Sequence, residues 1–479
     1  MSIDSISDPG TSGIVDMTTL SARRLLLAPE YLFVAIGLVF GLLFVYASPP
    51  WQANDEDRHF YNAYFHATGQ NGMRQDGNRV GGDLPANLLQ AASSFQGLQF
   101  SPTAKLNKSR VEQSALAPLD ESRTVFYDNP NHGQDPLAFA PHIAGIWISR
   151  FINSNPVHLL WGARIGGLLA YLAIVFAAIR TIPIHKWVLF AIALTPMALY
   201  QASSVTYDTL CIALAFLVVA LVVRFACRDR PVSTAELVLF FFVAILERYA
   251  KEGYFLLPFL FFIVPRKNIG SNAKMVAIFV LICALFFLPR FTWESYLASL
   301  GLHGGKALQT DFLFDTGRQL DFYLQRPVEF FSYLWLNILR QSKIWIAGAV
   351  GRFGYAYATL PGAVVFVHVL ALLGLSLLDS SKVHALSWRQ KLVAASVAFG
   401  SLALIVVGFF VKGSPVGAHE IFGIQGRYFL PILPVILLLN HVGGFRRGLP
   451  EKLKSLCVPL YCACMLGFSL VFINDYFYF

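Results

Sequence analysis

Long runs of apolar residues alternate with short basic connections along this chain of 479 residues. A helix needs roughly 20 residues to cross the hydrocarbon core of a bilayer. Runs near that length are 31–48, 158–179, 187–205, 208–226, 274–290, 361–378, 391–411, 427–440 and 456–473. No soluble fold needs so many continuous apolar segments. The pattern therefore predicts an all-α integral membrane protein.

One further apolar stretch, interrupted by charge, decides the predicted topology. Residues 237–246 and 254–264 are each too short to span comfortably, and the polar sequence ERYAKEG divides them. If they formed one broken span, the later basic loops would change sides, whereas a hairpin keeps all basic loops on the cytoplasmic side. We predict a hairpin over 237–265 with its charged tip facing outward, and about eleven membrane elements in all.

The distribution of charge along the chain supports this topology and argues against nucleic-acid binding. Only 14% of the residues are charged, 56% are hydrophobic, and the formal net charge is +9. The excess Lys and Arg residues lie in the short loops between apolar runs, which is the positive-inside signal rather than a nucleic-acid surface. The six cysteines lie in apolar runs or at a cytoplasmic edge, which argues against a disulfide scaffold.

These observations predict a protein with two large extracytoplasmic loops. The apolar part of the second loop is interrupted by Arg340, Gln341 and Lys343, which favours helices lying in the membrane interface over a span. The C-terminus falls outside. The expected parts are a cytoplasmic segment 1–29, an anchor 30–48, a first loop 49–157, a bundle 158–290, a second loop 291–360 and a C-terminal bundle 361–479.

The first loop begins with a candidate catalytic helix. Asn54 or Asp55 can cap it, and on the helix Asp55, Glu56 and His59 share one face. One interpretation is a capped, solvated helix at the membrane surface. The other is a general base held where a lipid-linked substrate presents its reactive carbon.

Two acidic and basic clusters follow along the chain. Asp208 begins an apolar run at its outer edge, either as a helix cap or as part of a cavity wall. In the hairpin tip, Glu247 and Lys251 could pair at i, i+4 spacing. Lys251 could instead contact a lipid phosphate as a compact point charge.

Two arginines complete the set of candidates. Arg352 and Arg427 each follow a glycine, precede an aromatic residue and lie at the outer end of a predicted span. Such arginines can snorkel to the membrane edge. They can also bind a phosphate or pyrophosphate leaving group through a bidentate fork. Four clusters rich in carboxylates and basic residues on one side favour a functional site.

Taken in order, the motifs resemble a known family. They are Asp-Glu-x-x-His after Pro49–Pro50, Pro-Met…Gln-Ala-Ser-Ser…Tyr-Asp, an Ala-Lys…Tyr hairpin, Gly-Arg-Phe-Gly…Leu-Pro and Gln-Gly-Arg-Tyr-Phe-Leu-Pro. The chain resembles, from Pro49 to about Pro434, a bacterial family of predicted membrane proteins of unknown function grouped with GT-C-type glycosyltransferases. The acidic pair lies further from the prolines than in the family pattern, which leaves Asp55, Glu56 and Asp57 as alternatives.

The resemblance implies a GT-C-like fold in the bacterial inner membrane. It also implies that the protein transfers a sugar from a polyprenyl-phosphate donor, with inversion. The acceptor would be a cell-surface glycan, such as an O-antigen, or a lipid-linked molecule. Asp55 or Glu56 would deprotonate the acceptor, with His59 on the same face. No cofactor is certain, although Asp55, Glu56 and Asp57 could hold Mg²⁺ or Mn²⁺. The substrate- and phosphate-binding residues would be Asp208, Lys251, Tyr254, Arg352, Gln425, Arg427 and Tyr428.

Two other functions share part of this pattern. A polysaccharide polymerase or ligase would use the same edge-on site with a lipid-linked oligosaccharide. A lipid or sugar transporter would need polar residues near the bilayer midplane and an internal repeat, whereas the charges here collect at one edge. The fold alone does not separate these functions.

Overall fold

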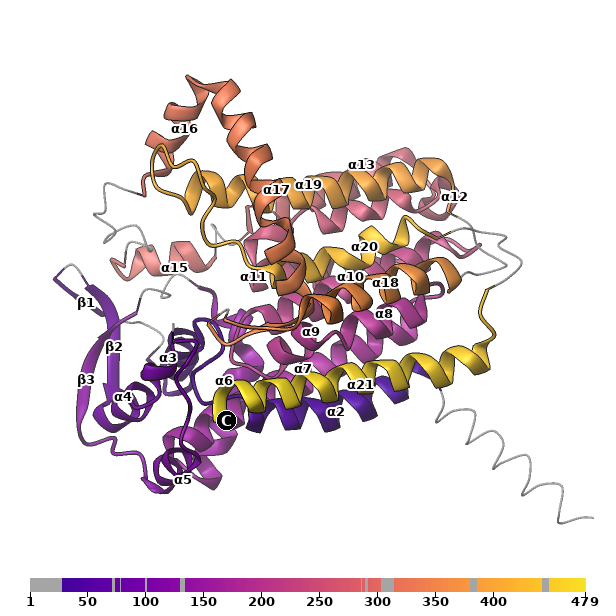
Figure 1. The fold of residues 1–479 in the computed structure, drawn as a ribbon. Coiled ribbons are helices and arrows are strands. Elements are labelled where there is room, and N and C mark those ends of the chain that lie inside the picture. The colour runs from indigo at the N-terminus through magenta and orange to yellow at the C-terminus, as the bar shows by residue number, and fades with distance from the viewer. Residues whose placement is uncertain are drawn as a thin grey trace, which may run out of the picture.

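The protein is a helical bundle with a small mixed α/β region at one end (Figure 1). The computed structural model describes residues 28–70, 74–77, 79–99, 101–129, 134–285, 287–288, 292–302, 314–355, 357–379, 386–441 and 448–479. The predicted N-terminal segment 1–29 lies almost entirely outside this range.

Long apolar helices form most of the bundle. In the described part of the chain, five helices are long and apolar enough to cross a membrane: α2 (Pro29–Ala47), α7 (Pro156–Thr181), α10 (Asp208–Ala226), α19 (Trp388–Lys412) and α21 (Glu451–Tyr478). Shorter apolar helical segments are α13 (Asn272–Leu285), α18 (Gly362–Leu378) and the pair η5 (Gly426–Ile432) and α20 (Leu433–Leu438). The chain is a mostly helical membrane protein, and the count of eleven membrane elements stays a prediction.

Proline interrupts one of the expected spans. The apolar run 187–205 forms α8 (Lys186–Ala193) and α9 (Pro196–Ala202), separated at Leu194 and Thr195. The break arises because Pro196 has no backbone N–H to continue the helix and disfavours the helical conformation of the residue before it. Its consequence is a turn that presents the polar residues after α9 to the outer loops.

The segment around 237–265 forms a hairpin of unequal arms. Its first arm is α11 (Thr234–Ala250), started by a capping box between Ser233 and Glu236. The chain turns at Lys251 and returns through η3 (Glu252–Tyr254), η4 (Leu257–Ile263) and α12 (Arg266–Ile269). The two ends meet, since the Val232 amide donates to the Asn268 carbonyl at 2.7 Å.

The first outer loop folds into its own unit beside the bundle. It contains a three-stranded antiparallel sheet in the order β1-β2-β3. The elements are α3 (Glu56–Ala67), β1 (Arg74–Asp76), β2 (Arg79–Pro85), α4 (Ala86–Ser93), η1 (Gln96–Leu98), α5 (Lys108–Leu116), β3 (Thr124–Asp128), η2 (Pro136–Phe139) and α6 (Ala140–Ile152). One of the two interpretations of α3, a solvated helix at the membrane surface, was wrong, because Phe60, Tyr64 and Phe65 are buried in the core of this unit.

The second outer loop is dominated by one long helix. It comprises α15 (Trp293–Ser299), α16 (Thr316–Leu324), α17 (Pro327–Gly351) and a two-stranded hairpin of β4 (Arg352–Phe353) and β5 (Ala358–Thr359). The 25-residue helix α17 runs obliquely across the outer end of the bundle, at a steep angle to α18 and α19 (Figure 1). Its C-terminal end points into the bundle, where the candidate site lies.

The two ends of the bundle differ in character. At one end the C-terminus packs on the first loop: the Leu106 amide donates to the Phe477 carbonyl at 2.6 Å, and Lys105 Nζ donates to the carbonyls of Asp475 and Tyr476. The start of α2 lies at the other end, where Lys186 approaches Glu30 at 3.8 Å. The C-terminus and the first outer loop therefore share one side.

Candidate functional site

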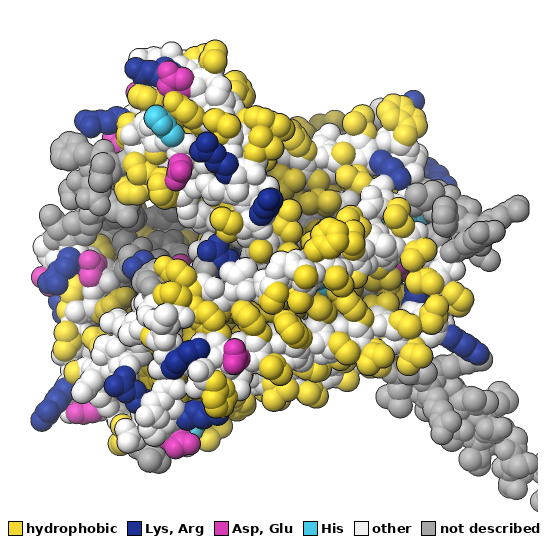
Figure 2. Space-filling model, viewed as in Figure 1, with side chains coloured by type: hydrophobic (Ala, Val, Ile, Leu, Met, Phe, Trp, Pro, Cys, Tyr) yellow, Lys and Arg dark blue, Asp and Glu magenta, His cyan; other side chains and the backbone are white. Residues whose placement is uncertain are grey.

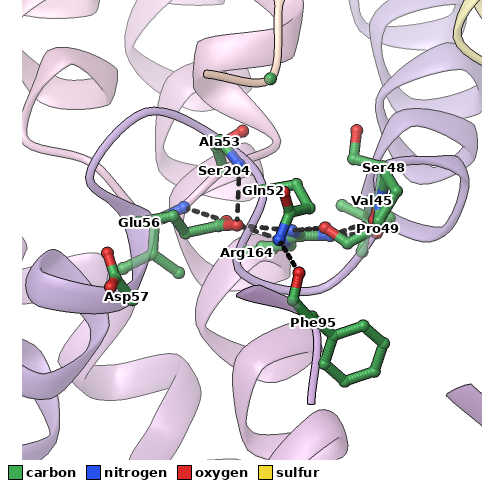
Figure 3. Close-up of polar contacts among 12 residues, drawn as sticks. Val45, Ser48, Pro49, Gln52, Ala53, Glu56, Asp57, Phe95, Arg164 and Ser204 are labelled. Atoms are coloured by element: carbon green, nitrogen blue, oxygen red, sulfur yellow. Dashed lines mark hydrogen bonds and ion pairs between the residues drawn. The ribbon is translucent and has the colours of Figure 1, made fainter. Parts of the chain in front are cut away.

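Glu56 forms a closed ion pair inside the protein (Figure 3). Its Oε1 and Oε2 accept hydrogen bonds from Nε and Nη2 of Arg164, at 2.8 and 2.6 Å, and both side chains are fully buried. The same arginine donates to the carbonyls of Val45, Ser48 and Pro49. Because the end of α2, the start of α3 and the first half of α7 meet at this pair, it fixes the first loop to the bundle.

This geometry removes Glu56 from the candidate bases. Its carboxylate also accepts from the amides of Ala53 and Val205, at 3.4 and 3.0 Å, so it is surrounded by donors. A base must present a lone pair to the acceptor hydroxyl. Figure 3 also shows Asp57 pointing away from this pair, so the acidic residues of the motif do not converge on one point.

Arg164 is a residue that the sequence analysis missed. It lies within the apolar run 158–179, and an ionisable residue in such a run is by itself a signal of a buried partner. The partner could not be identified from sequence, since Glu56 is 108 residues away. The pair therefore appears only once the fold brings α3 and α7 together.

Asp55 has a different environment from its neighbour. It is the N-cap residue of α3, as expected, but its backbone is left-handed with φ 58° and its side chain makes no capping hydrogen bond. A non-glycine residue in this region is uncommon and is held there by its surroundings. The Asp55 side chain is only partly buried. Glu56, by contrast, is fully buried.

A second buried cluster joins three distant motifs. Asp208 lies at the start of α10, and its Oδ1 is 2.7 Å from Lys251 Nζ while its Oδ2 is 2.7 Å from Arg427 Nε. Asp208 is 2% exposed and Arg427 is 4% exposed. Lys251 therefore pairs with Asp208 rather than with Glu247 one turn before it. Asp208 is not a simple helix cap.

The hairpin tip is packed into the protein rather than facing solvent. Glu247 and Arg248 are only 0% and 7% exposed, so the charged tip is buried, while the side of the membrane on which it lies stays a prediction. The tip is held by Lys251, whose ammonium lies 3.7 Å from the ring centre of Tyr428 and 4.7 Å from that of Tyr207. Such contacts stabilise a cation that has left water.

Aromatic side chains hold this cluster against the first loop. The Tyr254 hydroxyl donates to the Tyr428 carbonyl at 2.7 Å. The ring of His59 meets that of Tyr207 edge-on, with 4.8 Å between centres. His59 is 3% exposed, and burial lowers its pKa to about 4. The imidazole is therefore neutral at neutral pH and does not add a charge to the site.

Close backbone contact shapes a pocket beside the cluster. A Cβ added at Gly426 would lie 2.0 Å from the Trp345 carbonyl oxygen, and one at Gly348 would lie 3.0 Å from the Gly426 amide nitrogen. The glycine before Arg427 is thus needed where η5 crosses α17. The pocket at this crossing is lined by Asn54, Met197, Gly348, Arg352, Gln425, Gly426 and Arg427.

Polar contacts close the pocket on the side of the first loop. Asn54 Nδ2 donates to Gln425 Oε1 at 3.0 Å. The Tyr355 hydroxyl donates to Asp57 Oδ1 at 3.1 Å and accepts from Gln99 Nε2 at 2.9 Å. Burial raises the pKa of Asp57 above its usual value, although the Tyr355 hydrogen bond opposes this. The fold thus brings Asn54, Asp55, Asp57, Arg352, Gln425 and Arg427 to one region.

The carboxylates do not form a ready cation site in this arrangement. Among the residues that the structure describes, no group of three His, Cys, Asp or Glu side chains comes together. Of the three carboxylates expected to hold Mg²⁺ or Mn²⁺, Glu56 is engaged by Arg164 and Asp57 by Tyr355. The set does not fit a shared metal ion, and we derive no step through one.

The family comparison covers the motifs that build this site. A family model described as "Predicted membrane protein (DUF2142)" matches residues 38–436. The chain belongs to this family. The DUF2142 match includes α3, α10, the hairpin, α17 and η5. The membrane-protein family expected from the motif order is therefore confirmed. The description of the family does not mention GT-C glycosyltransferases, so that link stays a prediction. Searches of curated proteins and of solved structures found no match.

Proposed function

We propose that this DUF2142 protein is a GT-C-type membrane glycosyltransferase that moves a sugar from a polyprenyl-phosphate donor to a cell-surface glycan or lipid-linked acceptor, with inversion. One observation carries the proposal. Arg352 and Arg427, from motifs 75 positions apart, line the same pocket beside the N-terminus of α3. Two guanidinium groups facing one pocket suit a phosphate.

The donor phosphate occupies this pocket in the proposed complex. Arg427 donates to it through the terminal nitrogens of the fork, while the ion pair with Asp208 lies at Nε. Arg352 contacts the phosphate from the end of α17. Charge that develops on the departing phosphate in the transition state is then met by groups already in position.

Asp55 is the base in this mechanism. The acceptor hydroxyl attacks the anomeric carbon, the bond from that carbon to the phosphate oxygen breaks, and the phosphate leaves with the bonding electrons. The hydroxyl proton passes to the Asp55 carboxylate. Attack opposite the leaving group inverts the configuration at the anomeric carbon. Neutral His59, one turn along α3, packs on Tyr207 and keeps this end of the helix in place.

The proposed site faces outward from the bacterial inner membrane, with a cytoplasmic N-terminus and an extracytoplasmic C-terminus. The basic short connections at the end opposite the first loop support this orientation. Cysteine introduced at Gln75 or Pro415 should react with an impermeant thiol reagent in intact cells. Lys452→Cys, exposed near the start of α21, should react only after lysis. Labelling of Lys452→Cys in intact cells would reverse the orientation.

Mass spectrometry of surface polysaccharide from a deletion strain tests the reaction class. Loss of one sugar branch, restored by the wild-type gene, supports the transferase. Shortened or absent chains would instead indicate a polymerase or ligase. Unchanged linkages with accumulated lipid-linked precursor would indicate a transporter.

A further inference from the structure

A second pocket lies on the other side of the α17 terminus. It is lined by Lys343, Ile344, Ala347, Arg352 and Thr359. Arg352 also lines the first pocket, with Asn54 and Arg427. The two pockets therefore share Arg352, which directly follows the C-terminal end of α17.

Two adjacent small residues of α17 line the two pockets. Ala347 faces the second pocket and Gly348, the next residue, faces the first. The side chains of these two residues, a methyl group and a hydrogen, take up little room at the pockets. A phosphate bound at Arg352 would be close to both pockets, and its substituents could occupy either one.

The surface around the second pocket is apolar. On α17 the exposed large apolar residues include Leu339, Ile344 and Ile346, and on the neighbouring α18 they include Phe366, Val367 and Leu370. Figure 2 shows basic side chains over α17 next to the hydrophobic surface of α18. Within the described residues Lys343 forms no ion pair. A cation at the rim of an apolar surface suits an amphiphilic anion.

We propose that Lys343 and Arg352 form an entry port for the phosphate of a membrane lipid, whose long apolar tail lies along α17 and α18. This inference rests on the proposed function and names the route by which the donor reaches the first pocket. Lys343 attracts the phosphate at the lipid side, and Arg352 is the group common to the port and the reaction pocket. The tail stays outside, in contact with the bilayer.

The apolar lining selects a lipid over a free anion. A soluble phosphate would gain from Lys343 and Arg352 but nothing from Ile344 or Phe366, whereas a lipid phosphate gains from both. The port is also continuous with the proposed reaction pocket, through Arg352. A general attraction of basic helices to anionic headgroups would involve Arg340 as much as Lys343, since both are exposed on α17.

Binding of undecaprenyl phosphate to the full-length protein in nanodiscs tests the port. The variant is Lys343→Ala, and the matched control is Arg340→Ala, which removes an equal charge one turn away but outside the pocket lining. Loss of one charge-assisted contact should weaken binding about tenfold in Lys343→Ala only. Ala347→Phe, which fills the port without changing charge, should weaken binding as well.

Three outcomes would overturn the port. The first is equal weakening by Arg340→Ala and Lys343→Ala, which indicates general attraction of anionic lipid. The second is competition by inorganic phosphate as strong as that by undecaprenyl phosphate, which shows that the tail contributes nothing. The third is unchanged binding in both Lys343→Ala and Ala347→Phe. If binding depends on Lys343 but the protein transfers no sugar, the proposed function fails and the port stands.

Discussion

Two buried clusters of paired acidic and basic side chains join the first loop and the hairpin tip to the helical bundle, and they differ in whether a pocket adjoins them. In the first, Glu56 meets Arg164, and backbone groups of α2 and of the segments that precede α3 and α10 occupy the remaining positions. In the second, Asp208 meets Lys251 and Arg427, and Arg427 also lines a pocket. The first cluster is closed, whereas the second borders a pocket.

The adjacent residues Asp55 and Glu56 of one motif have different environments. Asp55 and Glu56 are adjacent in sequence, yet α3 begins between them. Glu56, inside the helix, points to Arg164, while Asp55, in a left-handed conformation, remains outside the regular helix. A carboxylate that anchors the loop therefore lies beside one that is only partly buried, the base of the proposed mechanism. Substitutions at the two positions should have effects of different kind.

Glu56→Gln should have the largest effect, and on folding. Removing one partner of a fully buried pair leaves the charge of Arg164 uncompensated, at a cost of about 3–5 kcal/mol. We expect loss of most folded protein from detergent extracts, or a large drop in the thermal unfolding midpoint. The control is Glu121→Gln, whose partner Arg150 is partly exposed and whose loss should cost about 1 kcal/mol or less. Equal stability of the two variants would contradict the structural role of Glu56.

Arg427→Lys should reduce turnover with a smaller effect on stability. Lysine keeps a positive charge near Asp208 but loses the fork that holds both Asp208 and a phosphate. We expect sugar transfer to fall by about tenfold or more, which corresponds to loss of one charge-assisted contact. Arg389→Lys, exposed at the start of α19, should behave as wild type. Full activity of Arg427→Lys would mean that this arginine only anchors the chain.

His59→Gln should have the smallest effect, on the pH dependence of stability. Burial lowers the pKa of His59 from about 6.5 to about 4, so on acidification the unfolded chain binds this proton first. The wild-type protein should therefore lose stability as the pH falls from about 6.5 to about 4. Removing the imidazole should flatten this part of the profile.

Thermal unfolding midpoints between pH 7 and pH 4.5 provide the comparison for His59. The control is His419→Gln, at an exposed position, which should leave the slope unchanged. A wild-type slope in His59→Gln would show that groups other than His59 set the acid sensitivity.

The sequence predicted the site better than it predicted the contacts within it. Five motifs separated by up to about 370 residues were expected on one side of the membrane, and the fold brings Asn54 within 3.0 Å of Gln425. The motifs carried this information because each lies at one end of an apolar run. The pairing of Lys251 with Asp208 rather than Glu247 could not be predicted, since helix spacing favours the local partner.

The first outer loop was the least predictable part of the fold. Its sheet consists of strands of three, seven and five residues, too short and irregular to show an alternating pattern. The burial of α3 was also unexpected, because Phe60, Tyr64 and Phe65 suit a membrane interface and a protein core equally well. Only tertiary packing decides between these two environments.

Asp55→Asn tests the central claim most directly. Asparagine has the same size and tolerates the left-handed backbone, so the protein should fold as wild type. We predict that sugar transfer from a polyprenyl-phosphate donor falls about 100-fold or more, since the variant cannot accept the acceptor proton. Binding of the donor should be unchanged, because the phosphate contacts are intact. Transfer at the wild-type rate would contradict the account, and loss of donor binding together with activity would assign Asp55 to the donor site instead.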